Sequence, residues 1–171
     1  YMIKKLNEAY NNIKILLENA RAKAYRSVNF IMVETYWNIG KIIVEEEQKG
    51  KERANYGEYL IKELSERLIN VYGKGFNISN LKNIRQFYIT FPKSYALRSQ
   101  LTWTHYRSIM RLENAEARNF YVIEAINNNW STRELERQIN SLLYERLILS
   151  KDKKKIKELS IKGQELQKPE D

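Results

Sequence analysis

The sequence contains no cysteine, and this absence excludes three kinds of chemistry. A chain without thiols has no disulfide, no thiolate nucleophile and no zinc site built on cysteine. His105 is the only histidine, so it is the one strong nitrogen ligand available to a metal. A single histidine close to Trp103 is most simply a packed or hydrogen-bonding residue. We therefore expect neither a metal nor a cofactor in this chain.

Aspartate, glycine and proline are also scarce. Asp occurs only at positions 152 and 171, so no Ser-His-Asp set can be assembled, and no Gly-rich phosphate loop is present. Glu34 lies beside Tyr36 and Trp37, where a paired core carboxylate is a simpler interpretation than a catalyst. We expect no enzyme activity in this chain. Six glycines and two prolines favour long helices over a turn-rich sheet protein.

Long hydrophobic runs are missing as well. No apolar run approaches the roughly 20 residues that cross a bilayer, and no secretory signal is recognisable. The composition, with 43% hydrophobic and 30% charged residues, is ordinary for a soluble globular protein. We expect a cytoplasmic protein that has no membrane partner.

Acidic residues are absent from one long segment, Arg67 to Leu112. Its 46 residues include eight Lys or Arg and no Asp or Glu, although an even spread of the 21 acids would place five or six there. Aromatic residues alternate with these cations. Cations displace the counterions of a polyphosphate and rings supply stacking faces, so the segment favours nucleic acid as a partner. A packed helical hairpin with a solvated basic face is the alternative. The basic residues are Arg67, Lys74, Lys82, Arg85, Lys93, Arg98, Arg107 and Arg111.

Apolar residues recur at helical spacing along most of the chain, which predicts an all-α fold. Residues 2–49 should form two long helices, or one helix broken near Arg26 and Ser27. Ser79 and Asn114 should cap their helices, and Ser131 with Glu134 forms a capping box. The later helices are expected at Tyr56 to Val71, Ser79 to Phe91, Thr102 to Leu112, Asn114 to Asn128 and Ser131 to Leu149.

Inward-facing positions follow from the same spacing. On the helix after Ser79 they are Leu81, Ile84, Tyr88 and Phe91, and on the last helix they are Leu135, Ile139, Leu142, Leu143 and Leu147. Residues 1–150 are expected to form one helical domain. Residues 151–171 are rich in lysine, and we expect a solvated helix or a linker there.

Two helix-turn-helix-like units are predicted, near 56–91 and 114–149. A short turn followed by a capped helix with a polar outer face can present that helix to the major groove. The first unit has the more basic surroundings, and the second has the tighter turn and the better cap.

Four ordered segments resemble the N-terminal domain of the YhcG-type bacterial nuclease family, and the resemblance extends over nearly the whole chain. The segments are residues 36–43 (YWNIGKII), 75–88 (GFNISNLKNIRQFY), 101–106 (LTWTHY) and 129–135 (NWSTREL). The resemblance implies a helical DNA-binding domain that precedes a PD-(D/E)XK nuclease domain, often near restriction-modification loci. It also implies that this chain is a fragment and that the nuclease part would follow Asp171.

The leading hypothesis from the sequence is therefore a DNA-binding module that targets a bacterial nuclease. The expected phosphate contacts are Lys82, Arg85, Arg107 and Arg111. The expected neighbours of base edges are Ser79, Asn83, Gln86, Arg133 and Arg137.

The alternative is a dimerisation or protein-interaction module that docks the parent nuclease to a restriction-modification subunit. It is motivated by apolar residues on several sides of one helix, because a helix that is apolar all round needs partners on all sides. These residues are Ile31, Met32, Val33 and Ile43. The two hypotheses are compatible, since helix-turn-helix proteins commonly bind DNA as homodimers. An autonomous nuclease is the least supported reading.

Overall fold

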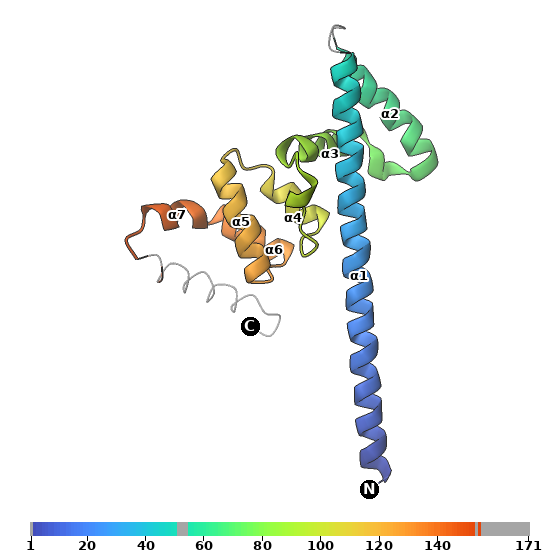
Figure 1. The fold of residues 1–171 in the computed structure, drawn as a ribbon, viewed down its shortest axis with the longest axis vertical. Helices are drawn as coiled ribbons and strands as arrows, with labels where there is room; N and C mark the ends of the chain where they lie inside the picture. The colour runs from blue at the N-terminus through green and yellow to red at the C-terminus, as the bar shows by residue number, and fades with distance from the viewer. Residues whose placement is uncertain (1, 51–54, 153, 155–171) are drawn as a thin grey trace. The chain divides into compact units, whose positions relative to one another are not determined.

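The computed structural model describes residues 2–50, 55–152 and 154. These residues form seven α-helices and two short 3-10 helices, with no strand among them, which confirms the predicted all-α fold (Figure 1). The chain divides into two compact units, Tyr1–Thr102 and Trp103–Asp171, and each is described by itself. The single domain over 1–150 stays a prediction. Most of the predicted linker at 151–171 lies outside the described residues.

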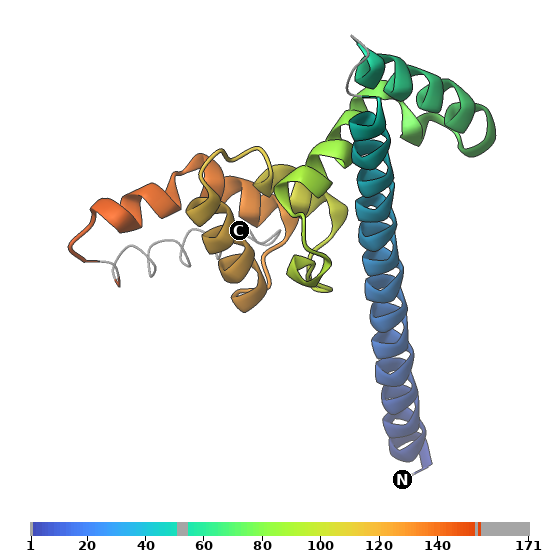
Figure 2. The same ribbon diagram turned by 45° about the horizontal axis from the view of Figure 1, so that its top comes forward.

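The first helix, α1, is continuous from Met2 to Lys49. Its 48 residues extend over about 72 Å at 1.5 Å per residue, and it is a long rod in both views (Figures 1 and 2). The predicted break near Arg26 and Ser27 was wrong. Neither residue breaks a helix, and the Ser27 hydroxyl donates to the Lys23 carbonyl oxygen at 3.0 Å, which accommodates it within the helix.

Unit 1 is built on the packing of α3 (Ile78–Thr90) across the C-terminal half of α1. Gly40 is where the two backbones come closest: a Cβ added there would collide with the Ile84 carbonyl oxygen and would lie 3.0 Å from Tyr88 Cβ. Beside it, the Trp37 indole N–H donates to the Phe91 carbonyl oxygen at 2.6 Å. The glycine therefore allows an approach that any side chain would block. The buried apolar residues of this contact are Val33, Trp37 and Ile43 on α1, and Leu81, Ile84 and Phe87 on α3.

Helix α2 (Tyr56–Tyr72) closes unit 1 near the end of α1, and its range agrees with the prediction. Gly73 ends it with a φ of 89°, a conformation that glycine adopts without steric cost. The short helix η1 (Lys74–Phe76) follows, and the Ser65 hydroxyl donates to the Phe76 carbonyl oxygen at 2.9 Å. This bond fixes the turn between α2 and α3.

Two details predicted for α3 were wrong. Its N-cap is Asn77 rather than Ser79, because the Asn77 side chain accepts the Asn80 backbone N–H at 2.8 Å. Its third buried residue is Phe87, whereas Tyr88 and Phe91 are only partly buried. The earlier start shifts Ser79 into the first turn, where its side chain is exposed. The 3-10 helix η2 (Ser94–Ala96) lies beyond α3.

Unit 2 is a small cluster of four helices. Its helices are α4 (Trp103–Ile109), α5 (Ala115–Asn127), α6 (Thr132–Asn140) and α7 (Leu143–Leu149). Asn114 caps α5, and the capping box of Ser131 and Glu134 is present, both as predicted. His105 is buried, and its Nε2 lies 2.8 Å from the Trp130 carbonyl oxygen, so the histidine is the packed, hydrogen-bonded residue expected.

The predicted helix from Ser131 to Leu149 is broken in two. Leu142 takes a φ of 55°, separates α6 from α7 and is exposed rather than inward-facing. The Tyr121 hydroxyl accepts the Tyr144 backbone N–H at 3.1 Å and donates to the Gln138 carbonyl oxygen at 3.3 Å. A side chain of α5 thus replaces the missing cap of α7. Burial raises the pKa of this hydroxyl, which favours its neutral, hydrogen-bonding form.

Replacing Gly40 with alanine should destabilise unit 1 by about 1–3 kcal/mol, although alanine is the better helix former by roughly 1 kcal/mol. The cause is the collision with the α3 backbone at Ile84. Gly75→Ala is the matched control, because no atom lies within 4 Å of an added Cβ there. Urea unfolding followed by circular dichroism measures both variants, and equal stabilities would contradict the close packing.

Replacing Tyr121 with phenylalanine should destabilise unit 2 by about 1–2 kcal/mol, because the partly buried Tyr144 backbone N–H loses its partner and the buried Gln138 carbonyl oxygen keeps only the Ser141 hydroxyl. The Tyr144 amide should also exchange its hydrogen faster. Tyr144→Phe is the control, since the Tyr144 hydroxyl donates to the exposed side chain of Glu116 at 3.1 Å. If the control lost as much stability as Tyr121→Phe, the capping role of Tyr121 would be excluded.

Candidate nucleic-acid interface

The basic excess of the protein lies in unit 1. Residues 1–102 contain 17 basic and 10 acidic residues, a net charge of +7, whereas residues 103–171 contain 13 and 11, a net charge of +2. Between residues 103 and 152 the two signs balance, with seven of each. A surface that binds a polyanion is therefore expected on unit 1.

Helix α3 presents a polar ridge on its outer side. Ser79, Lys82 and Gln86 follow one another at spacings of three and four residues, and all three side chains are exposed. The ridge points outward because the apolar residues of α3 are turned towards α1. Asn83 is half-buried at its flank. Three of the predicted contact residues are thus together on one free face, which we call the α3 ridge.

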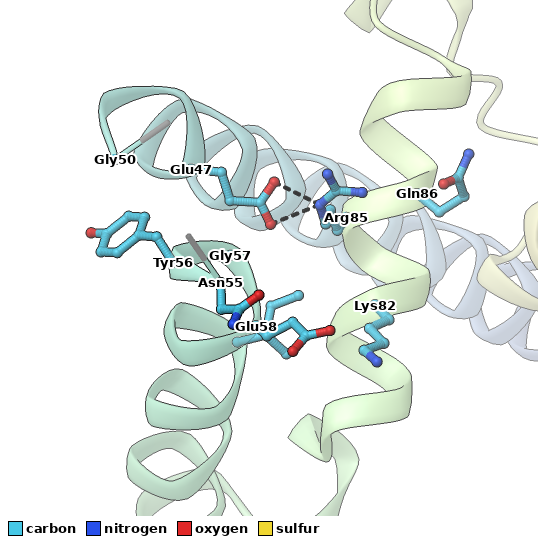
Figure 3. Close-up of a pocket in the computed structure, with 10 residues that line it drawn as sticks. Glu47, Gly50, Asn55, Tyr56, Gly57, Glu58, Lys82, Arg85 and Gln86 are labelled. Carbon is cyan, nitrogen blue, oxygen red and sulfur yellow. Dashed lines mark hydrogen bonds and ion pairs between the residues drawn. The ribbon is translucent and has the colours of Figure 1, made fainter. Parts of the chain in front are cut away.

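Arg85 is held in an ion pair that the sequence did not reveal. Its Nε donates to both carboxylate oxygens of Glu47 at 2.7 Å, and Figure 3 shows the side chain reaching from α3 to the end of α1. The side chains are 36% and 15% exposed, so the pair is only partly hydrated. Arg85 therefore joins two helices in addition to carrying charge. Glu47 stands in the acidic run 45–47, which resembles a solvated helix end, and its partner is 38 residues away.

A cavity of about 540 Å³ lies beside this pair, between the end of α1, the start of α2 and α3 (Figure 3). Glu47 and Glu58 line it together with Lys82 and Arg85. Two carboxylates and two cations offset each other, so the cavity has no clear preference for an anion. Lys82 and Gln86 of the α3 ridge also line this cavity, but α3 itself carries no acid, so the ridge is the better candidate for contact with phosphate.

The other predicted contacts lie on unit 2 and do not form an equivalent face. Arg111 and Arg133 are exposed, whereas Arg107 and Arg137 are half-buried. On the outer side of α6, Glu136 lies between Arg133 and Asn140 and accepts a hydrogen bond from the Ser108 hydroxyl at 3.1 Å. This acid reduces the attraction of α6 for a polyanion.

Neither a metal centre nor a transmembrane helix is found in the residues that the structure describes. Those residues contain no group of three or more His, Cys, Asp or Glu placed to hold a metal ion. Among the same residues, every helix is too short or too polar to span a bilayer.

Comparisons with known proteins agree with the motifs noted in the sequence. The DUF1016 N-terminal domain family matches residues 12–146. The chain is 36% identical over 178 residues to "Putative nuclease YhcG" of Escherichia coli strain K12, an alignment that covers 85% of this chain and 48% of that protein. The chain thus spans about half the length of this relative, and no solved structure matches it significantly. The chain belongs to the YhcG-type family and carries its DUF1016 N-terminal domain.

Proposed function

We propose that this chain is a DNA-binding module that targets a bacterial nuclease. The observation that carries the proposal is the α3 ridge, an exposed and acid-free face on the second helix of the α2–α3 pair. Lys82 supplies a cation for a phosphate, and Ser79 and Gln86 supply hydrogen-bonding groups for phosphates or base edges. All three belong to one face of a 13-residue helix. An α-helix with its side chains is about 10–12 Å across, so it fits a major groove about 12 Å wide.

The α2–α3 pair is a better candidate than the α5–α6 pair. Both consist of two helices joined by a short connection, which many all-helical proteins contain. The charge decides between them: unit 1 carries +7, while α6 has Glu136 in the middle of its outer face. A phosphate backbone is attracted to the first surface and is partly repelled by the second.

The nuclease part of the proposal comes from the family. The relative in Escherichia coli is called a nuclease, and the chain corresponds to about half of it. In a protein of this kind, the helical module would bind DNA in the cytoplasm and a separate catalytic domain would cut it. Action beside a restriction-modification system, with one of its subunits as a partner, belongs to the same proposal.

Lys82→Ala tests the ridge. The variant should bind a labelled duplex more weakly than the unchanged chain, and the slope of log affinity against log salt concentration should fall by about 1, because one phosphate contact is lost. Lys62→Ala is the matched control, since Lys62 is an exposed lysine on α2 of the same unit. Fluorescence anisotropy at several salt concentrations measures both. Arg85 is unsuitable for this test because its loss would leave Glu47 without its partner.

Identical salt slopes for Lys82→Ala, Lys62→Ala and the unchanged chain would contradict the ridge as the contact surface. Binding of single strands and duplex with equal affinity would contradict recognition through a groove. Gln86→Ala adds a separate measure, because losing a base contact should alter the preference among duplex sequences while leaving the salt slope unchanged.

A second function, self-association, is favoured by a different observation. Between residues 3 and 28 of α1 no side chain is buried, although this segment is rich in apolar residues. The arrangement of those residues is specific enough to identify a partner.

A further inference from the structure

Helix α1 has two apolar faces, and unit 1 covers only one of them. The covered face holds Val33, Trp37 and Gly40, which pack against α3. On the opposite side a second series of residues recurs every three or four positions, and every member is exposed. We call this series the α1 stripe. It consists of Ile3, Leu6, Tyr10, Ile13, Leu17, Ala20, Ala24, Val28, Ile31, Thr35, Asn38 and Ile42.

The exposure of the α1 stripe is large. Its eight large apolar residues are between 56% and 75% exposed. At roughly 100 Å² each, they offer about 800 Å² from one protomer, which equals the share of one partner in a standard interface. In addition, no side chain between positions 3 and 28 is buried, and a bare helix of that length is marginal in water. The stripe therefore needs a partner helix.

The order of the residues in the α1 stripe indicates which partner. The stripe is nearly symmetric about its centre: positions at equal distances from the middle have numbers that sum to 44 or 45. Two copies of α1 laid antiparallel would thus meet layer by layer over the whole stripe. The opposed residues are Ile3 with Ile42, Leu6 with Asn38, Tyr10 with Thr35, Ile13 with Ile31, Leu17 with Val28, and Ala20 with Ala24.

The residue types fit this register. The two alanines meet at the centre, where small side chains allow the helix axes to come close, and the larger residues lie on either side. The polar members are already bonded within their own helix: the Thr35 hydroxyl donates to the Ile31 carbonyl oxygen at 2.7 Å, and the Asn38 amide donates to that of Glu34 at 2.9 Å. On burial, the Thr35 hydroxyl proton and one amide proton of Asn38 therefore keep their partners.

The charge along α1 also selects the antiparallel arrangement. Residues 2–32 contain six basic and two acidic residues, whereas residues 33–49 contain two basic and four acidic residues. An antiparallel pair places the +4 half of one helix beside the −2 half of the other. A parallel pair would place the two +4 halves side by side, which is repulsive.

We propose that the chain forms a homodimer through an antiparallel pair of α1 helices, joined along the α1 stripe about a two-fold axis near residues 22 and 23. Such an interface is isologous, because both copies use the same stripe and each opposed pair of residues therefore occurs twice. This proposal does not depend on DNA binding, and the α3 ridge remains exposed in each protomer's unit 1. The partner is a second copy of this chain rather than another subunit.

Sedimentation of the 171-residue chain between roughly 1 and 100 μM tests the pair. The unchanged chain should be a dimer, and Ile13→Glu with Leu17→Glu should make it a monomer, because four carboxylates would be buried in the dimer. The control is Ile15→Glu with Asn19→Glu. It adds the same charge, and Ile15 is 54% exposed but lies off the α1 stripe. The control should remain a dimer, and both variants should keep the helix content of the unchanged chain.

The relative direction of the two α1 helices is tested separately with one engineered thiol, which is unique because the chain has no cysteine. A nitroxide on Asn7→Cys should give a distance between the two labels of about 46 Å, since position 7 lies opposite position 38 of the other helix. A parallel pair would bring the labels to within about 20 Å. A monomeric unchanged chain, a control that dissociates as far as the stripe variant, or a short distance would each overturn the proposal.

Discussion

The close approach of α1 and α3 at Gly40 is the contact on which the rest of unit 1 depends. With no side chain at that position, the backbone of α1 reaches the Ile84 carbonyl, and Trp37 can donate its indole N–H to the end of α3. This contact sets the rotation of α3 about its own axis, because Leu81, Ile84 and Phe87 must point to α1. The opposite side of α3, with Ser79, Lys82 and Gln86, is consequently left to solvent.

The same contact gives the two faces of α1 different roles. The face that holds Gly40 is occupied by α3, so the helix has one remaining apolar face, the α1 stripe. One helix can then serve both the internal packing of unit 1 and association with a second copy. In the dimer that we propose, each α3 packs on the face of α1 opposite the α1 stripe, so the two α3 ridges would lie on opposite sides of the helix pair and face in opposite directions. Each ridge would therefore bind DNA independently of the other.

Much of this arrangement follows from the sequence. The all-α fold, the range of α2, the Asn114 cap and the capping box of Ser131 with Glu134 are local features, set by apolar spacing and by side chains within a few residues. The polar character of the α3 ridge was predictable for the same reason. The family was also recognisable, because its motifs are contiguous in the chain.

The failures concern contacts between distant residues. No local signal pairs Arg85 with Glu47. No local signal places a break at Leu142 between α6 and α7 either, because the cap of α7 comes from Tyr121 on another helix. The break predicted near Arg26 and Ser27 failed for the opposite reason: polar residues were taken for a boundary, although an exposed helix tolerates them. Arg137 was counted as an outer residue, yet it is half-buried.

Hydrogen–deuterium exchange of the chain with and without saturating duplex DNA tests the central claim most directly. If the α3 ridge lies against the duplex, amide exchange in residues 78–90 should slow on binding, while exchange in residues 132–140 of α6 should not change. Slower exchange in α6 together with unchanged exchange in α3 would contradict the account. Saturated DNA binding that leaves amide exchange in both helices unchanged would contradict it as well.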